Sequence, residues 1–346
     1  LLEQLRNRTT PLLAVDLPTG LQGDTGQYAP GFAPHSDASN RAVRHTLALL
    51  TLKPGLFTGA GRDAAGSVWL DDLGCDTSAE PHSAWLSGPP AAQARTHASH
   101  KGSYGDVAVI GGEGLQARGM GMTGAALLAA SAALHAGAGR VLVALLGGST
   151  LELDVLQPEL MFRHIDVLPM AQLTVVCGCG GGDAVRAVLP RVLALAQRLV
   201  LDADALNAVA ADTALQQALA ARARQGKGTT LTPHPLEAAR LLGTDTGAVQ
   251  AHRLVAAERL ADRFGCVVVL KGSGSVIAVP GQSPTINPTG NARLATAGTG
   301  DVLAGLIGAR WAAGMDPLRA ATEAVYAHGQ AADLWPAGQV LTARAL

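Results

Sequence analysis

The chain has 346 residues, of which 48% are hydrophobic and 15% are charged, and its formal net charge is −1. This composition predicts a large buried core and excludes a disordered chain, while the near-neutral charge argues against a nucleic-acid binder. No apolar run reaches the roughly 20 residues that a membrane-spanning helix needs, and no signal peptide opens the chain, so we expect a cytoplasmic protein. The four cysteines lack the paired spacing of zinc sites and are expected to be reduced thiols.

Short apolar runs alternate with longer helical stretches along most of the chain. Aromatic residues make up only 3% of it, so the core must be built from Ala, Leu and Val. Such runs are typical of buried strands in a mostly parallel sheet, and their alternation with helices predicts an α/β fold. The expected strands are 12–15, 107–110, 141–144, 173–176, 199–201 and 267–270, and the clearest expected helices are 122–135, 246–264 and 300–313.

Residues 76–99 are expected to separate two domains, because they contain turn-forming stretches such as Gly88-Pro89-Pro90. The part before them has about half the length of an ordinary α/β domain. We interpret it as the tail of a domain in a longer gene product. The expected organisation is a partial domain over 1–80, a linker over 81–99 and a main domain over 100–346.

Two glycine clusters lie near the expected strands. Residues 119–124 match G-x-G-x-x-G, but no acidic residue ends the next apolar run, where a Rossmann dinucleotide site needs one. The chain also lacks the P-loop pattern of Walker-type enzymes. Residues 178–182 directly follow an expected strand, and bare backbone there would let a ligand approach closely.

Polar residues stand directly after two of the expected strands, 199–201 and 267–270, and at a further strand end near His234. Asp202 and Asp204 could bind Mg²⁺ through water or cap the next helix, and we expect one to cap and the other to face a site. His234 stands between two prolines, so it is either a rigid ligand contact or part of a capping turn with Glu237. Lys271 leaves a strand into a Gly/Ser turn, where it either reaches a phosphate or is a solvated hairpin lysine.

The strongest local signal is Gly298-Thr299-Gly300-Asp301 before an apolar helix. The amides of such a turn converge at a helix N-terminus, whose partial positive charge binds anions, above all phosphate. Asp301 could be an ordinary helix cap. A carboxylate directly after an anion cradle is also what phosphoryl transfer to a hydroxyl requires, because it places a base beside the phosphoryl group.

Taken in chain order, these motifs over residues 100–346 resemble the ADP- or ATP-dependent NAD(P)H-hydrate dehydratases, a ribokinase-like family with a three-layer fold and a mostly parallel central sheet. Cys179 departs from the family pattern, which usually has Pro there, and the segment 113–122 lacks an expected Tyr. Further matching stretches are His100-Lys101-Gly102-Ser103-Tyr104-Gly105, Gly111-Gly112, Gly124-Ala125, Gly137-Ala138-Gly139 and Asn287 with Gly290-Asn291.

The resemblance implies a lyase that repairs hydrated nicotinamide cofactors. The S epimer of NADH or NADPH hydrate would be phosphorylated from ADP, with Mg²⁺, and elimination of phosphate would restore the cofactor and leave AMP. The implied partners are these small molecules and further copies of the chain in a homo-oligomer. The implied catalytic groups are Asp301 as base with Gly298, Thr299 and Gly300 around the phosphoryl group; the nucleotide contacts are Lys271, Gly272, Ser273, Gly274, Ser275 and Gly300; the hydrate contacts are Ala125, Gly182, His234 and Asp301.

The first 80 residues resemble the last third of an NAD(P)H-hydrate epimerase, a partial Rossmann-like domain. The resemblance rests on the stretch from Ala14 to Gly20 and on Lys53-Pro54-Gly55-Leu56. It implies that Asp16 contacts the hydrate and that Thr19 helps to bind K⁺. The chain by itself is not expected to epimerise.

Two other functions stay open on the sequence. A ribokinase-like small-molecule kinase would share Asp301 and the glycine turn but would stop at a stable phosphate ester. An inactive nucleotide-binding scaffold would bind nucleotide without turnover.

Overall fold

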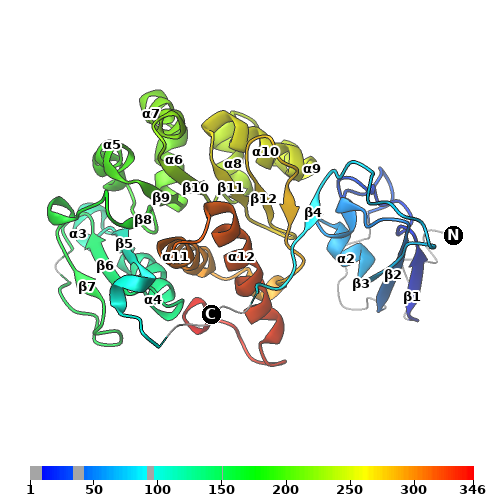
Figure 1. Ribbon diagram of the computed structural model, residues 1–346, viewed down its shortest axis with the longest axis horizontal. Helices are drawn as coiled ribbons and strands as arrows, with labels where there is room; N and C mark the ends of the chain where they lie inside the picture. The colour runs from blue at the N-terminus through cyan, green and yellow to red at the C-terminus, as the bar shows by residue number, and fades with distance from the viewer. Residues whose placement is uncertain (1–9, 34–42, 92–96, 150) are drawn as a thin grey trace.

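The computed structural model describes residues 10–33, 43–91, 97–149 and 151–346, and within these residues the strands form two sheets. The smaller sheet is parallel, and its unit lies at one end of the molecule (Figure 1). Its strands, in spatial order, are β1 (Leu12–Val15), β2 (Arg44–Leu49) and β3 (Ser67–Asp71), and against them pack η2 (Pro54–Leu56) and α2 (Gly61–Ala65). The buried hydrophobic side chains of this unit are Leu21, Ala48, Leu56, Ala64 and Ala65.

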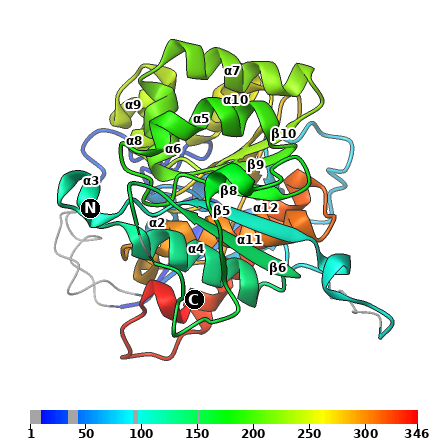
Figure 2. The ribbon, with the colours of Figure 1, turned by 90° about the vertical axis from the view of Figure 1, so that its left-hand side faces the viewer.

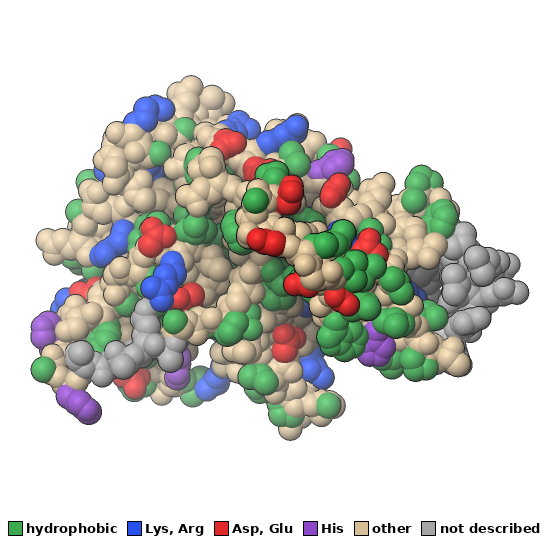
Figure 3. All heavy atoms as spheres, turned by 45° about the vertical axis from the view of Figure 1, so that its right-hand side comes forward, with side chains coloured by type: hydrophobic (Ala, Val, Ile, Leu, Met, Phe, Trp, Pro, Cys, Tyr) green, Lys and Arg blue, Asp and Glu red, His purple; other side chains and the backbone are tan. Residues whose placement is uncertain are grey.

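The small unit also leaves large hydrophobic side chains in solvent. Leu13 and Val15 on β1 are 63% and 61% exposed, and Trp69 and Leu70 on β3 are 52% and 48% exposed. Hydrophobic side chains gather on the part of the surface that this unit forms (Figure 3). An exposed apolar surface of this kind is typical of an interaction surface.

The described part of the larger sheet has ten strands in the order β4-β13-β12-β11-β10-β9-β8-β5-β6-β7. Neighbouring strands from β11 to β7 are parallel, whereas β12 is antiparallel to both of its neighbours. The bounds are β4 (Trp85–Leu86), β5 (Asp106–Gly111), β6 (Arg140–Leu145), β7 (Met161–Phe162), β8 (Thr174–Cys177), β9 (Arg198–Leu201), β10 (Gly228–Leu231), β11 (Val267–Leu270), β12 (Val276–Ala278) and β13 (Thr285–Ile286).

Helices cover both faces of this sheet (Figure 2). Ala108 and Ile110 of β5 pack into one core cluster and Val107 and Val109 into the other, because successive side chains of a strand point to opposite faces. The mostly parallel α/β fold predicted from the sequence is therefore confirmed. One face carries α5 (Val185–Leu195), α6 (Ala203–Ala210), α7 (Thr213–Arg224), α8 (Pro235–Leu242), α9 (Thr246–Ala251) and α10 (Arg253–Phe264), and the other carries α4 (Thr123–His135), α11 (Thr299–Ala312) and α12 (Pro317–Leu334). The shorter helices are η3 (Lys101–Tyr104), α3 (Leu115–Arg118), η4 (Ile165–Val167), η5 (Ala292–Leu294) and η6 (Ala343–Ala345).

The predicted strands are all present, each ending within one residue of its expected bounds. The single helix predicted over 246–264 is instead two helices, because the backbone leaves the helical region at His252 (φ −138°, ψ 63°). The expected linker contains β4, whose Trp85 N donates to Pro284 O at 2.8 Å and so adds a strand to the large sheet. Within the described residues, no helix combines the length and apolar character needed to cross a bilayer.

Helix α11 packs against α4 so closely at Gly305 that no side chain fits between them. A Cβ at Gly305 would lie 2.1 Å from the carbonyl oxygen of Ala129. We expect Gly305→Ala to lower the free energy of unfolding by about 1–3 kcal/mol, because the two helices must move apart. Chemical denaturation measures this difference.

The matched control is Gly124→Ala in α4, where no atom outside the local chain lies within 4 Å of the new Cβ. This change is expected to leave stability equal or to raise it by up to about 1 kcal/mol, because alanine restricts the unfolded chain. Equal stabilities for the two variants would contradict the packing argument.

Candidate active site

The polar motifs of the sequence meet at one edge of the large sheet. Cys177 aligns with Leu201 and Leu201 with Leu231, so β8, β9 and β10 end side by side. The start of α11 lies against the same edge, because a Cβ at Gly300 would be 3.3 Å from Lys271 Nζ. Motifs that are up to about 120 residues apart in sequence therefore form one site, as parallel strands with ligands at their carboxyl ends commonly do.

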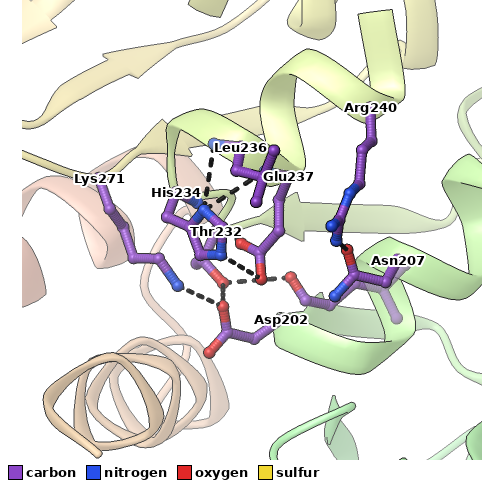
Figure 4. A network of polar contacts seen from close by, with 9 residues as sticks. Asp202, Asn207, Thr232, His234, Leu236, Glu237, Arg240 and Lys271 are labelled. Atoms are coloured by element: carbon purple, nitrogen blue, oxygen red, sulfur yellow. Dashed lines mark hydrogen bonds and ion pairs between the residues drawn. The ribbon is translucent and has the colours of Figure 1, made fainter. Parts of the chain in front are cut away.

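The centre of this edge is an ion pair between Lys271 and Asp202 (Figure 4). Lys271 Nζ donates to Asp202 Oδ1 at 2.6 Å, and Thr232 Oγ1 donates to the same oxygen at 2.8 Å. Asp202 is 1% exposed and Lys271 is 18% exposed. Burial lowers the pKa of Lys271, but Asp202 and Glu237 raise it by more, so the pKa lies above its ordinary value and the lysine is charged.

Helix α11 begins with a bare backbone turn. Gly298 is the N-cap residue in the left-handed region (φ 90°), which glycine adopts without strain. Asp301 is the third residue of the helix, so the alternative that it is an ordinary N-cap is wrong. Thr299 Oγ1 donates to Leu294 O at 2.8 Å, and His328 Nε2 donates to Thr299 O at 2.9 Å. These two bonds hold the turn through the hydroxyl and the carbonyl group of Thr299, so neither of them uses an N–H group of the turn.

Asp301 is a partly buried carboxyl group with an altered acidity. Burial, followed by the charge of Asp202, raises its pKa to about 7, although a hydrogen bond with Cys179 and the charge of Lys271 act in the opposite direction. A carboxyl group that titrates near neutrality is suited to general-base catalysis at neutral pH.

Cys179 is the residue of this site that the sequence interpretation missed. It is fully buried, and its sulfur lies within 4.8 Å of carboxylate oxygens of Asp202 and Asp301. Burial, with the charges of the two carboxylates, raises the pKa of the thiol well above its ordinary value, so it is a donor and not a thiolate. The available signal was its place in the glycine cluster directly after β8, at the same sheet edge as the other motifs.

His234 caps helix α8. Its Nδ1 accepts hydrogen bonds from Leu236 N at 3.1 Å and Glu237 N at 3.3 Å, while Glu237 Oε2 accepts from His234 N at 2.8 Å. His234 Nε2 lies 3.2 Å from Glu237 Oε1, so it carries the proton and both ring nitrogens are engaged. The capping alternative is confirmed, and a ligand at His234 would meet its half-exposed ring. Burial raises the pKa of the Glu237 carboxyl to about 7.

Ala125 and Gly182, the predicted hydrate contacts, lie close to the same glycine cluster. A Cβ at Gly180 would be 2.8 Å from the Cβ of Ala125, and Gly182 N donates to Asp204 Oδ2 at 2.8 Å. Asp204 therefore holds the cluster, and neither it nor Asp202 caps α6 with its side chain. The expectation that one of the two carboxylates caps the helix with its side chain is wrong, because each carboxylate binds donors outside the helix.

The predicted nucleotide loop 271–275 faces two ways. Lys271 points toward Asp202 and Gly300, whereas the backbone of Ser273 meets the small unit, since Gly59 N donates to Ser273 O at 3.0 Å. Gly272 has φ 131°, a conformation that favours glycine.

Asp16 and Thr19 are not part of this cluster, because they follow β1 in the small unit. The Asp16 carboxylate pairs with Lys53 and accepts from Leu49 N at 3.1 Å, and the bond with Lys53 holds the pKa of Asp16 below its ordinary value. Thr19 is exposed.

One group of side chains in the described residues could hold a metal ion, namely Cys179, Asp202 and Asp301. A protonated thiol is a poor ligand for a hard cation. Mg²⁺ in phosphoryl-transfer sites commonly takes one or two carboxylates, with phosphate oxygens and water completing its shell. Asp202 fits that pattern, since its Oδ2 would lie 3.9 Å from a Cβ at Gly300 in the glycine turn that begins α11.

Comparison with known proteins gives consistent matches. The family model described as NAD(P)H-hydrate dehydratase matches residues 107–346. The bifunctional NAD(P)H-hydrate repair enzyme Nnr of Escherichia coli is 35% identical over 96% of this chain, which spans 63% of that relative's length. The ADP-dependent (S)-NAD(P)H-hydrate dehydratase of Neisseria meningitidis is 42% identical, over 71% of this chain and 82% of the relative.

A solved structure is similar as well. The ADP/ATP-dependent NAD(P)H-hydrate dehydratase of Bacillus subtilis, co-crystallised with ATP and Mg²⁺, superposes with a TM-score of 0.58 at 30% identity, covering 73% of this chain and 90% of that one. This similarity confirms the ribokinase-like fold expected from the sequence.

Proposed function

Because the chain belongs to the NAD(P)H-hydrate dehydratase family, we propose that it converts the S epimer of NAD(P)H hydrate to NAD(P)H at the expense of ADP. The observation that carries the proposal is Asp301, a carboxyl group with a pKa of about 7 beside the glycine turn at the start of α11. ADP as the donor is favoured by the similarity to the ADP-dependent relative of Neisseria meningitidis.

The proposed chemistry has two stages. Asp301 removes the proton of the hydrate's hydroxyl group, whose oxygen attacks the terminal phosphoryl group of ADP and releases AMP. The amides of Gly298, Thr299 and Gly300 bind that phosphoryl group and stabilise the charge that develops on it. The C–O bond to the phosphate group then breaks while the neighbouring ring carbon loses a proton, which forms the ring double bond, releases phosphate and restores the dihydronicotinamide of NAD(P)H.

The remaining contacts follow from the geometry of the edge. Lys271 lies beside Gly300, where its charge can bind the nucleotide phosphates, and the loop through Gly272, Ser273, Gly274 and Ser275 would bind the rest of the nucleotide. Mg²⁺ would be held by Asp202 and the phosphates and would neutralise phosphate charge. The hydrate would lie against Ala125, Gly182 and the ring of His234.

For the small unit we propose a relation to NAD(P)H-hydrate epimerases, in which Asp16 would contact the hydrate and Thr19 would help to bind K⁺. The bifunctional Escherichia coli relative supports this relation, because it aligns with 96% of the chain. We also propose that the protein is cytoplasmic and that it forms a homo-oligomer. Size-exclusion chromatography with light scattering would test the oligomeric state.

The direct test of the proposed reaction is absorbance at 340 nm. NADH hydrate is incubated with the protein and Mg²⁺, with and without ADP, and the products are separated. Recovery of absorbance only with ADP, together with AMP and phosphate, is the expected result. A stable phosphate ester would instead indicate a kinase, and nucleotide binding without turnover would indicate an inactive scaffold.

The pH dependence of the reaction is predicted from Asp301. Since a base must be deprotonated, kcat/KM is expected to rise with pH until it levels off above about 7, where the Asp301 carboxyl is ionised. The Cys179 thiol lowers the pKa of Asp301 by hydrogen bonding. Cys179→Ala is therefore expected to move the acid limb to higher pH.

The matched control is Cys179→Ser, which keeps a donor at the same place and is expected to leave the acid limb closer to that of the unaltered enzyme. The pH dependence of kcat/KM for the hydrate, at saturating ADP, is measured for the unaltered enzyme and for both variants. An acid limb that is identical in the alanine and serine variants would exclude Cys179 as the partner of the base.

A further inference from the structure

The small unit touches the large one at the loop that follows β11. The backbone of Phe57, Thr58 and Gly59, called here the junction segment, lies between η2 and α2. Gly59 N donates to Ser273 O at 3.0 Å, and Ser273 Oγ donates to Gly59 O at 3.0 Å. A Cβ at Gly274 would lie 1.9 Å from Phe57 O, so the two backbones are in direct contact. The loop therefore rests on the small unit as well as on its own sheet.

The buried side chain of Arg253 contacts both the loop after β11 and the junction segment. Arg253 is the first residue of α10 and is only 2% exposed. Its Nη2 lies 3.3 Å from Leu270 O, 3.2 Å from Lys271 O and 3.3 Å from Gly274 O. Burial lowers the pKa of Arg253 to about 10, so the guanidinium keeps its charge at neutral pH. A single buried cation thus binds the carbonyl groups at both ends of the loop.

Thr58 connects this cation to the junction segment. The side chain is fully buried, and its Oγ1 accepts a hydrogen bond from Arg253 Nε at 3.0 Å. The same hydroxyl donates toward Ser273 O and Gly274 O, each at 3.4 Å. Because a buried guanidinium that loses an acceptor is costly, Arg253 is held in its orientation by a residue of the small unit.

We propose that the small unit helps to shape the nucleotide site, with Thr58 and Arg253 as positioning residues for the loop Lys271–Ser275. The proposal rests on the proposed function, since it assumes that this loop binds ADP. The loop contains Gly272 and Gly274, both at positive φ, and hydrogen bonds from Lys271 N to Pro233 O and from Asn287 N to Ser275 O hold its two ends. Contacts from the junction segment restrict it to the conformation in which Lys271 faces Gly300.

The experiment compares two variants of the full chain at one position. Thr58→Val keeps the buried volume and removes the hydroxyl, whereas Thr58→Ser keeps the hydroxyl. The dissociation constant of ADP is measured by calorimetry, KM for the hydrate and kcat at 340 nm, and amide hydrogen exchange over residues 270–275 by mass spectrometry. Gln27→Leu is the control, because Gln27 Nε2 donates to Gln250 O at 2.9 Å across the same two units without touching the loop.

For Thr58→Val we expect ADP binding to weaken about tenfold, as loss of a hydrogen bond to a charged group would cause, with faster exchange in the loop and KM for the hydrate within about twofold. Thr58→Ser and Gln27→Leu are expected to behave like the unaltered protein. Equal losses for ADP and hydrate, or unchanged exchange in the loop, would overturn the proposal.

Two further outcomes are separable. If the unaltered chain binds no ADP, the proposed function fails, and hydrogen exchange still shows whether Thr58 orders the loop. If Thr58→Val does not fold, Arg253→Lys is measured in its place, because lysine keeps the buried positive charge and lacks the forked guanidinium. The proposal then requires Arg253→Lys to weaken ADP binding more than hydrate binding. A general loss of stability in Arg253→Lys without selectivity for ADP would overturn the proposal.

Discussion

Asp301→Asn is expected to lower kcat by about a hundred- to ten-thousand-fold, the usual contribution of a general base, while ADP affinity changes by no more than several-fold. The asparagine keeps the size of the side chain and the amides of the α11 turn but cannot accept the proton of the hydroxyl. Single-turnover measurements at 340 nm and calorimetry with ADP separate the two effects. Turnover at the normal rate would exclude Asp301 as the base.

The melting temperature of Asp301→Asn tests the altered acidity of Asp301 independently of catalysis. The pKa of Asp301 is about 7 in the folded protein, whereas the ordinary pKa of an aspartate side chain is 3.8. The Asp301 carboxyl ionises more readily in the unfolded chain than in the folded protein. It therefore opposes folding increasingly as pH rises from 3.8 to 7, and to its full extent above pH 7. The asparagine variant is not subject to this effect, so its melting temperature at pH 8 should exceed that of the unaltered protein.

A surface substitution controls for the chemical change itself. Asp316→Asn alters an exposed carboxylate that caps α12, where asparagine caps equally well. This variant is expected to keep both activity and melting temperature. A melting temperature for Asp301→Asn at pH 8 that falls to the assay temperature would mean that its loss of activity comes from unfolding rather than from chemistry.

The sheet and the approximate place of the site could be predicted from the sequence because both depend on local patterns. An apolar run such as Val267–Leu270 is a buried strand whatever lies beside it, and Lys271 must then stand at its carboxyl end. Parallel pairing brings such strand ends together, and the motifs at 202–207, 232–237 and 271–275 lie at one edge for that reason.

The partners of individual side chains could not be predicted, because they depend on distances between segments that are remote in the sequence. Asp204 binds Gly182 N, and Cys179 lies against Asp301, although neither pair is close in the chain. Thr58 lies 195 residues from Arg253, and nothing in its local pattern distinguishes it from a surface threonine. Only the packing of the small unit on the loop gives it a role.

Lys271→Met is the second substitution with a large expected effect. It should weaken ADP binding by about 10- to 100-fold, because a charge-assisted contact with phosphate is lost, and it should affect hydrate binding much less. Calorimetry with ADP and KM for the hydrate measure the two losses. The control is Lys227→Met, since Lys227 Nζ donates only to Ala194 O and Gln225 Oε1 at the surface.

The same substitution leaves the Asp202 carboxylate buried without its cation. We therefore expect Lys271→Met to lower the free energy of unfolding by about 3 kcal/mol. Adding Asp202→Asn removes the unpaired charge and keeps an acceptor for Thr232, so the double variant should regain much of this stability. It should not regain ADP affinity, because the nucleotide still lacks the lysine. If ADP affinity returned with stability, the effect of Lys271 on the nucleotide would be indirect. A larger loss for the hydrate than for ADP would place the nucleotide elsewhere on the sheet edge.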